Sequence, residues 1–576
     1  MAEHDLEIET ERVDDVPLLL AQQVGMGIPD VLNQIASPHG NRRGLSVGWL
    51  AASWLSYIVS RADHRLSEVE PWAGACLSLL SRVIPEPVCR KDFTDDRLAD
   101  LLRWLAEDEV WATVEREVGT RLVGVYQLDR RLVRLDSTSV SVYHDAEEST
   151  LFGYGHSKDH RPDLAQFKVM LATLDPLGLP VATLVVPGEQ ADDPLYVPAI
   201  QAARPVVGQG GLLYVGDAKM SALSTRAFVA LGGDYYLTPL PLSGEVPALL
   251  SELVAAGDQL ALTRVEDPPA GPDAEPALLA SGFETTRSLQ AAWEATPVSW
   301  QERVLVVHSP GHAKRQHQNL TERVARAQQS LVALTAPRAR GRRQWTDYSS
   351  LEAAVAAILK RERVEGLLKV DYQWETERRW VRAYGERPAR VEHRGRFVLQ
   401  VEPDEAAIAA AGRLFGWRLY VTNAPREQLS LADAVRAYRS SHHIEHGFSR
   451  LKGRPLGIRP VYLQREAHVR GLARLLSLAL RLLTVMEYVV RKRLAGTGEV
   501  LRGLYAGNPM RPAVRPTAER LLRAFRGITL TVVRLPDQTV RHVTPLSQLQ
   551  RRILDLLDLP VAIYDDLALS TTRIPP

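Results

Sequence analysis

The chain has 576 residues, and a soft prior of one domain per ~150 residues predicts three or four domains. A hydrophobic content of 45% with 24% charged residues is ordinary for globular proteins and excludes wholesale disorder. The net charge of +1 neither requires nor excludes a nucleic-acid partner, so the distribution of charge along the chain matters more than its sum.

Nothing in the sequence directs the chain to a membrane or to an oxidising compartment. Only Cys76 and Cys89 are present, too few for a disulfide framework. No basic and then apolar leader opens the chain. The most apolar stretch, Leu472–Val490, is interrupted by charged residues and is better explained as a buried helix than as a membrane span. We therefore expect a cytoplasmic protein without a membrane partner.

The first region, residues 1–125, is predicted to be helical. Val47–Ile58 and Asp96–Leu105 carry apolar residues at three- and four-residue spacing, and no strand alternation is visible. No specific helix-turn-helix signature is present. A role for this region in binding DNA ends therefore rests on its position alone.

Residues 126–242 have a different pattern, in which short apolar runs come first and then alternate with helices. This order predicts a mixed α/β sheet. The predicted strands are Arg131–Asp136, Leu164–Leu174, Leu179–Val186, Gly211–Asp217 and Asp234–Leu240, and the predicted helices are Pro194–Ala203 and Met220–Leu231.

The pattern loosens over residues 243–412, which we interpret as a β-rich insertion with a basic loop, Ala336–Arg343, as a candidate DNA contact. Residues 413–465 return to the core with a predicted strand, Trp417–Thr422, and a helix that starts at Ser430 and runs to Lys452. The tail, residues 466–576, is predicted to be mostly helical.

Three acids are candidate ligands for divalent metal ions. Asp136 and Asp217 each end a predicted strand, and Glu445 lies on the later helix. Mg²⁺ prefers oxygen ligands, and two such ions about 4 Å apart stabilise the attacking and leaving oxygens of a phosphoryl transfer. Each aspartate also has an ordinary interpretation: Asp136 as part of a turn or helix cap, and Asp217 as a helix cap.

Glu445 belongs to a regular spacing, because Tyr438, Glu445 and Lys452 are seven residues apart in each step. At 3.6 residues per turn such residues return nearly to one face of a helix. A carboxylate between a phenol and an ammonium suits a metal ligand between phosphate contacts. The ordinary alternative is an exposed charged helix face.

Basic residues near these acids are candidate DNA contacts. Lys158, His160 and Arg161 lie in a polar loop between strands, where they could contact phosphate oxygens or simply be solvated. Arginines exceed acids around the Glu445 helix, as a DNA-facing helix requires. The candidates there are Arg439, Arg454 and Arg459.

The segment Tyr438–Lys452 resembles the Tyr-Arg-Glu-Lys signature of bacterial insertion-sequence DDE transposases. Tyr438, Glu445 and Lys452 match its spacing, whereas Ser441 occupies the position of the arginine. The resemblance covers residues from about 130 to 470 in the expected order. Its other parts are Gly155–Asp163 with Gln166, Gly188 with Asp192, Val215–Asp217, Val421–Asn423 and Arg459–Tyr462.

The resemblance implies an RNase H-like core with a β-rich insertion between Asp217 and Glu445. Asp136, Asp217 and Glu445 would be the catalytic residues and would bind two Mg²⁺ or Mn²⁺ ions. The implied reaction is nicking at transposon ends followed by attack of the freed 3′-hydroxyl on target DNA. The implied partners are double-stranded DNA of the terminal inverted repeats and the target, and a second copy in a synaptic complex. The implied location is the bacterial cytoplasm, in association with the nucleoid.

Two alternatives remain open. His442, Glu445 and His446 form a His-x-x-Glu-His pattern, which zinc peptidases use with a third ligand that is not identified here. That interpretation gives no role to Asp136 and Asp217. The other alternative is a non-catalytic DNA-binding protein descended from a transposase.

Overall fold

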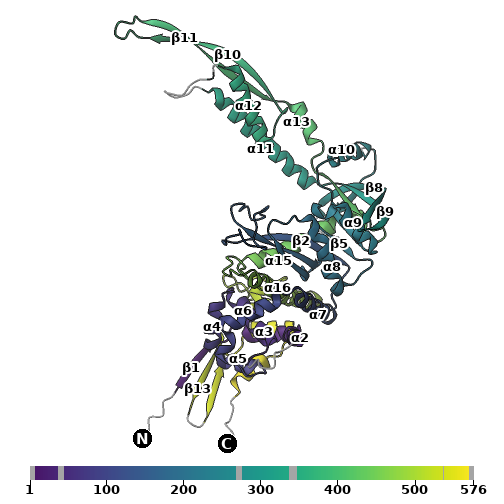
Figure 1. The fold of residues 1–576 in the computed structure, drawn as a ribbon, viewed down its shortest axis with the longest axis vertical. Helices are drawn as coiled ribbons and strands as arrows, with labels where there is room; N and C mark the ends of the chain where they lie inside the picture. Colours follow the sequence, from purple (N-terminus) through teal and green to yellow (C-terminus); the bar gives the residue numbers. More distant parts are fainter. Residues whose placement is uncertain are drawn as a thin grey trace. The chain divides into compact units, whose positions relative to one another are not determined.

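The computed structural model describes residues 7–36, 44–257, 259–267, 276–336, 345, 347–535 and 538–569. The chain divides into two compact units (Figure 1). The first comprises Met1–Thr238, Ser288–Gln301 and Arg436–Pro576, and the second comprises Pro239–Arg287 and Glu302–Val435. Most of the basic loop predicted at Ala336–Arg343 lies outside the described residues.

A mixed sheet forms the centre of the first unit. Its strands lie in the order β4-β3-β2-β5-β6, with β2, β3 and β4 antiparallel and with β5 parallel to both β2 and β6. Every residue of β3 is buried, including Lys168, as expected for a mostly apolar strand covered on both faces. The predicted mixed sheet is confirmed. The elements are β2 (Leu132–Ser141), β3 (Gln166–Leu174), β4 (Leu179–Pro187), α8 (Tyr196–Val207), β5 (Leu213–Val215), α9 (Leu223–Leu231) and β6 (Tyr235–Pro239).

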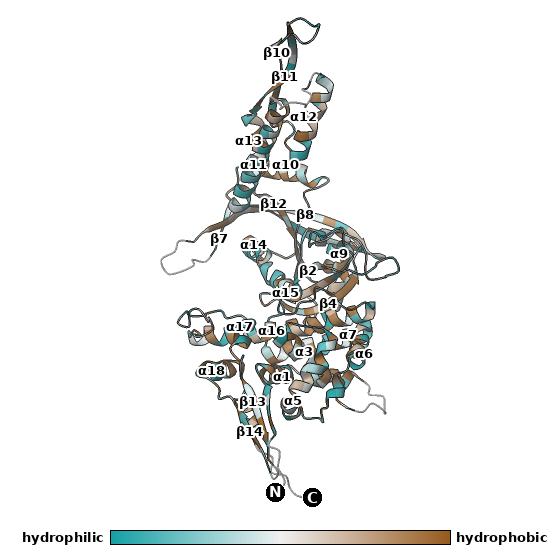
Figure 2. Cartoon of the chain, turned by 90° about the vertical axis from the view of Figure 1, so that its left-hand side faces the viewer, coloured by the Kyte–Doolittle hydropathy of each residue, from teal (hydrophilic) through white to brown (hydrophobic). Residues whose placement is uncertain are grey.

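The predicted N-terminal and C-terminal helical regions belong to this same unit. The 32-residue helix α16 (Glu466–Thr497) packs against α1, α3, α6 and β4. Much of this helical body is hydrophobic in Figure 2. In the described part of the chain, no helix is long and apolar enough to cross a membrane. The other helices are α1 (Val16–Gly25), α2 (Ile28–Ile35), α3 (Val47–Arg61), α4 (Val69–Ala75), α5 (Leu77–Val83), α6 (Asp95–Ala106), α7 (Asp108–Tyr126), α17 (Ala518–Arg523), α18 (Gln548–Leu557) and α19 (Ala562–Asp565).

A small sheet corrects the expectation that residues 1–125 contain no strand. β1 (Glu7–Arg12) pairs antiparallel with β13 (Thr529–Arg534), which in turn pairs with β14 (Thr539–Val543). The strand was missed because its partner lies more than 500 residues away and because its sequence, EIETER, is mostly exposed. Its single buried side chain is Glu11, whose carboxylate accepts hydrogen bonds from two backbone amides, both at 2.8 Å.

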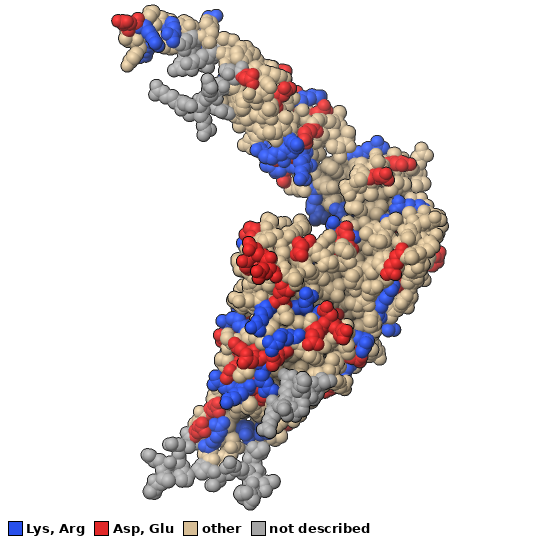
Figure 3. All heavy atoms as spheres, viewed as in Figure 1, with Lys and Arg blue, Asp and Glu red and all other residues tan. Residues whose placement is uncertain are grey.

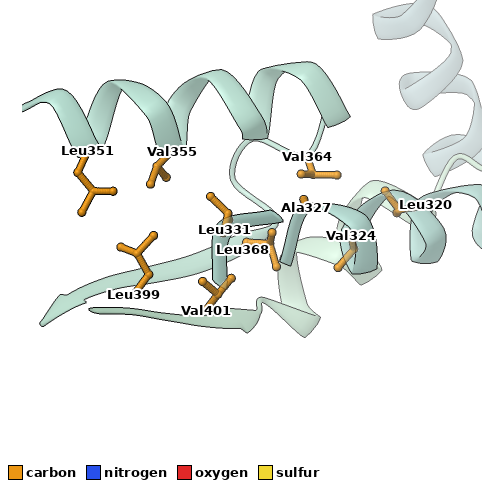
Figure 4. Close-up of a cluster of buried hydrophobic side chains, with 10 residues drawn as sticks. All are labelled: Leu320, Val324, Ala327, Leu331, Leu351, Val355, Val364, Leu368, Leu399 and Val401. Carbon is orange, nitrogen blue, oxygen red and sulfur yellow. The ribbon is translucent and has the colours of Figure 1, made fainter. Parts of the chain in front are cut away.

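The second unit contains helices as well as strands, so the predicted β-rich insertion is only partly correct. Helices α11 and α12 pack against each other, and α11 packs against β11, around the apolar cluster drawn in Figure 4. The predicted strand β12 (Trp417–Thr422) is confirmed, but it belongs to this unit, in the order β12-β9-β8-β7. The other elements are α10 (Val246–Gly257), β7 (Thr263–Glu266), β8 (Leu278–Trp293), β9 (Thr296–His308), α11 (Pro310–Thr335), α12 (Tyr348–Glu362), β10 (Leu368–Val381), β11 (Arg390–Pro403) and α13 (Glu405–Gly412), of which β8 and β9 are shared with the first unit through Ser288–Gln301.

Candidate active site

Two of the three predicted acids lie at neighbouring positions of the central sheet. β2 and β5 are parallel and pair Arg134 with Val215, so the register continued by two residues brings Asp136 level with Asp217. Neighbouring strands lie about 4.8 Å apart. Burial, and then the negative charge of Asp217, raise the pKa of Asp136, and the charge of Lys158 only partly opposes them. The two carboxylates therefore share one electrostatic environment.

Lys158 supplies positive charge at this pair. Its Nζ lies 3.2 Å from Asp136 Oδ1 and donates to the Ser137 carbonyl at 2.6 Å. It also lies 3.8 Å from a carboxylate oxygen of Asp192, whose other oxygen pairs with Lys168 at 2.8 Å. Burial raises the pKa of Asp192, but its partners outweigh burial and the net shift is downward. A lysine that we predicted as a DNA contact thus lies against the acids.

Asp217 is held by residues that the sequence analysis did not single out. The Tyr196 hydroxyl donates to Asp217 Oδ1 at 2.6 Å, and the Lys219 amide donates to the same oxygen at 2.8 Å. Thr238 Oγ1 donates to the Asp217 carbonyl at 2.6 Å. The only signal in the sequence for Tyr196 is its position shortly after Asp192, which, with Gly188, is one part of the resemblance to DDE transposases.

The third acid, Glu445, lies on α15 (His442–Lys452), which packs against β2. Its side chain is exposed, and the Ser441 hydroxyl donates to its Oε1 at 3.0 Å. Among the residues that the structure describes, no group of three or more His, Cys, Asp or Glu side chains could hold a metal ion. The structure thus pairs Asp136 with Asp217 but does not bring Glu445 into a three-acid cluster.

The long helix predicted from Ser430 to Lys452 is wrong, because α14 (Leu431–Arg439) ends before α15 begins. At the break, the Ala437 carbonyl accepts hydrogen bonds from the Arg134 guanidinium and from Ser440 Oγ. Side-chain donors of this kind compete with the helical backbone pattern. Tyr438 therefore does not share a continuous helix face with Glu445, whereas Lys452 does lie on α15.

Two predicted DNA contacts meet an acid that the sequence analysis passed over. Lys452 Nζ lies 2.8 Å from Asp159 Oδ1, and Arg459 lies 2.9 Å from Asp159 Oδ2. The Asp159 side chain is only 13% exposed, so this contact joins the loop after β2 to the end of α15. The only signal in the sequence for Asp159 is its position within Gly155–Asp163, another part of the resemblance to DDE transposases.

The remaining predicted DNA contacts lie at the surface. His160, Arg161, Arg439 and Arg454 are exposed, and Arg161 forms an ion pair with Asp163 at 2.7 Å. On the face shown in Figure 3, lysines and arginines of this unit are interspersed with acids and do not form a patch of one sign. DNA contact therefore stays a prediction for these four residues.

The histidines of α15 do not assemble a zinc site with the described residues. The rings of His442 and His443 lie 4.0 Å apart, centre to centre. Burial, and then the charge of His442, lower the pKa of His443 to about 4. Burial also lowers the pKa of His446. Within the described ranges, the third ligand that a peptidase requires is missing.

Comparisons with known proteins add little to this geometry. No family model matches the chain. No curated protein matches it either. Among solved structures, the chain is similar to a cryo-EM structure of a piggyBac transposase synaptic complex with hairpin DNA. The identity is 10% and the TM-score 0.24, over 85% of this chain and 84% of that chain. Likeness at this level does not establish a shared fold, and the function has to be inferred from the chain's own residues.

Proposed function

We propose that the chain is a DDE transposase, which cuts DNA at transposon ends and transfers the freed strand into target DNA in the presence of divalent metal ions. The observation that carries this proposal is the position of Asp136 on β2, level with Asp217, which follows the end of the neighbouring parallel strand β5. Three antiparallel strands followed by two parallel strands that alternate with helices also support an RNase H-like core.

The proposed cofactors are two Mg²⁺ or Mn²⁺ ions, for which Asp136 and Asp217 supply carboxylate oxygens. Burial and the nearby Asp217 raise the pKa of Asp136, so a bound cation would relieve an existing repulsion. Carboxylate oxygens are the ligands that these ions prefer. Asp136 and Asp217 would hold them, with Glu445 of α15 as the third ligand. When bound, such ions activate water and then a 3′-hydroxyl for attack on phosphorus.

The other residues of the site position the acids and the DNA. Tyr196 fixes the orientation of the Asp217 carboxylate through its 2.6 Å hydrogen bond. Lys158 neutralises charge between Asp136 and Asp192 and is available to a phosphate oxygen. Further DNA contacts are proposed for the following residues: His160, Arg161, Tyr438, Arg439, Lys452, Arg454 and Arg459. The proposed partners are double-stranded DNA and, because two ends must be joined, a second copy of the chain in the bacterial cytoplasm.

The test is metal-dependent cleavage of a supercoiled plasmid that carries the DNA flanking the coding region. We expect nicking and strand joining with Mg²⁺ or Mn²⁺. Asp136→Asn, Asp217→Asn and Glu445→Gln should each lower the rate by ~10³-fold, because a lost metal ligand removes several kcal/mol of transition-state stabilisation. Asp129→Asn is the matched control, since Asp129 is exposed and lies just before β2. Equal rates in the control and the Asp136 variant would refute the proposal.

A second candidate, a non-catalytic DNA-binding protein, is favoured by one observation: Glu445 is exposed and lies outside the aspartate pair. This protein would bind the same plasmid fragment without cutting it under either metal. The absence of short inverted repeats bounded by a target duplication in the flanking DNA would also favour it.

A further inference from the structure

A cavity of about 220 Å³ in the first unit is lined by three arginines, Arg454, Arg523 and Arg526. The first follows α15 directly, and the other two lie at and just beyond the end of α17. None of the three catalytic acids proposed above lines this cavity. It is therefore a feature separate from the aspartate pair.

The three arginines are exposed, and no carboxylate in the described ranges lies within ion-pair distance of them, although the charge of Arg526 acts on Asp15. Clusters of like charge without partners repel one another, which is unfavourable unless an anion is present. By contrast, the long buried helix of the same unit pairs its arginines with acids, as Arg481 pairs with Glu115. The cavity thus carries positive charge that the fold leaves available.

Two acids also line the cavity, but both have other partners. Glu519 accepts a hydrogen bond from Arg450 Nε at 2.7 Å. The Asp15 carboxylate accepts a hydrogen bond from Ser60 Oγ at 2.6 Å. Burial raises the pKa of Asp15 to about 6, although the Ser60 hydrogen bond and the positive charge of Arg526 oppose this shift, so its surroundings on balance disfavour a negative charge. The charge that the cavity offers to a ligand is therefore positive.

We propose that this cavity binds a phosphate group, either the phosphodiester of a DNA strand or a free phosphate. The planar guanidinium group donates two parallel hydrogen bonds to phosphate oxygens, which makes arginine well suited to this anion. Arginines from two segments far apart in the sequence converge on one space, as a built binding site requires. A phosphate held there would join the end of α15 to the C-terminal region.

This inference deepens the proposed function but does not require DNA cleavage. Arg454 is already a predicted DNA contact, whereas Arg523 and Arg526 are new. We therefore test it in the Asp136→Asn protein. In that background little cleavage is expected, so phosphate and duplex binding are measured independently of catalysis.

The experiment measures two ligands against matched variants. Binding of a labelled 30-base-pair duplex is followed by fluorescence anisotropy at several salt concentrations, and binding of inorganic phosphate by calorimetry. The variants are Arg523→Gln/Arg526→Gln and Arg454→Gln. The control is Arg520→Gln, because Arg520 lies on α17 but stacks on Tyr505 and donates to its hydroxyl at 2.8 Å.

If the cavity holds a DNA phosphodiester, the double variant should weaken duplex binding by ~10-fold or more and reduce the salt slope by about 2, one for each arginine. Loss of inorganic phosphate binding with unchanged duplex binding identifies a free phosphate as the ligand. Arg454→Gln, in the loop after α15, should weaken binding of the same ligand. This single variant provides the test if the double variant does not fold.

Asp15→Asn should change ligand binding in the direction opposite to the arginine variants. Removing a negative charge from the lining should tighten binding of the same ligand several-fold, because the carboxylate repels it. The proposal is overturned if the arginine variants match Arg520→Gln with both ligands, or if Asp15→Asn weakens binding.

Discussion

Asp136 and Asp217 are placed by backbone pairing between β2 and β5, whereas α15, which carries Glu445, is placed by side-chain packing against β2 and α16 and by polar contacts near its two ends. Near its N-terminal end, Arg134 donates to the Ala437 carbonyl of α14 and to Ser440, which lies between α14 and α15. At its C-terminal end, Asp159 binds Lys452. Because strand register depends on many backbone bonds, single substitutions should leave the aspartate pair in place. In the part of the chain that the structure describes, the helix has no backbone pairing to a neighbouring element and depends on its buried apolar face and on polar side-chain contacts, so loss of a buried polar contact should weaken its attachment.

The largest effect is expected from Arg134→Ala. Arg134 forms a buried ion pair with Asp175 at 2.9 Å and donates to Ser440 Oγ at 2.7 Å, and both charged side chains are at most 6% exposed. Removing one partner leaves an uncompensated buried charge, which costs ~3–5 kcal/mol. We expect a loss of that size in the free energy of unfolding, measured by urea denaturation.

Arg131→Ala is the control for this prediction. Arg131 pairs with Asp129 at 2.6 Å, but its side chain is 86% exposed. Exposed pairs contribute only ~0–1 kcal/mol. Similar losses in the Arg131 and Arg134 variants would show that the network beside Ser440 does not hold α15.

A smaller effect is expected from Asp159→Asn at the other end of the helix. The substitution removes the ion pairs with Lys452 and Arg459. Both the Asp159 and Lys452 side chains are less than 15% exposed, so we expect a loss of ~1–3 kcal/mol in the free energy of unfolding. Metal-dependent cleavage should fall as well, since α15 carries Glu445.

Asp163→Asn tests whether burial of the ion pair is the reason for the loss of stability expected in Asp159→Asn. Asp163 lies in the same loop, but its partner Arg161 is 46% exposed, and Asp163 itself is 60% exposed. We expect a change of less than ~1 kcal/mol and unchanged cleavage. A loss equal to that of Asp159→Asn would mean that the loop matters and the buried contact does not.

The same contrast explains which parts of the fold the sequence predicts. The strands of the central sheet have apolar runs bounded by turns, and some ranges are close to those in the structure, as for β4 (Leu179–Pro187) against a predicted Leu179–Val186. The two strands before the aspartates differ more, because β2 continues to Ser141 past its predicted end at Asp136, and β5 (Leu213–Val215) stops before Asp217. The two aspartates could still be found from local sequence. The pairing of β2 with β5, which brings the aspartates level, is seen only in the structure.

Features that depend on distant partners could not be found in this way. The break between α14 and α15 is fixed by Arg134, about 300 residues earlier in the chain. The pairing of Asp159 with Lys452 spans 293 residues. Strand β1 requires β13 from the far end of the chain. The hydrophobic periodicity of a short stretch of sequence carries no information about contacts with residues this far away.

The aspartate pair gives a prediction about stability in which a bound metal ion acts in the opposite direction to the repulsion between the carboxylates. The raised pKa of Asp136 means that the folded protein binds this proton more tightly than the unfolded chain does. The contribution of Asp136 to the free energy of unfolding is then most favourable at low pH. It falls as the pH rises past the pKa of this carboxyl in the unfolded chain. Without metal, Asp136→Asn should be more stable than the wild type at pH 8, and the difference should shrink toward pH 3.

With Mn²⁺ at ten times its dissociation constant, a single site should add about 1.4 kcal/mol to the wild type and little to Asp136→Asn. Thermal unfolding in both buffers measures the two effects. Equal stabilisation of both proteins by Mn²⁺ would place the ion elsewhere. A wild type that is more stable than the variant without metal at pH 8 would contradict the repulsion between the aspartates.

The smallest effect is expected at Ser441, the position where the family signature has arginine. Its hydroxyl donates to Glu445 Oε1 at 3.0 Å on an exposed part of α15. Exposed hydrogen bonds contribute little, so Ser441→Ala should change the free energy of unfolding by less than ~0.5 kcal/mol. Cleavage should change by no more than a few-fold, because Glu445 keeps its carboxylate.

Ser441→Arg is the informative partner of this variant, because it places a cation four residues before Glu445 on the same helix face. If this position contacts phosphate, as the family signature implies, duplex DNA should bind more tightly to Ser441→Arg than to Ser441→Ala, with a salt slope larger by about 1. Fluorescence anisotropy over several salt concentrations measures both quantities. A tighter complex with an unchanged salt slope would indicate that the arginine acts by holding Glu445. Unchanged affinity and slope would mean that DNA does not pass this end of α15, and that the likeness to the signature is limited to Tyr438, Glu445 and Lys452.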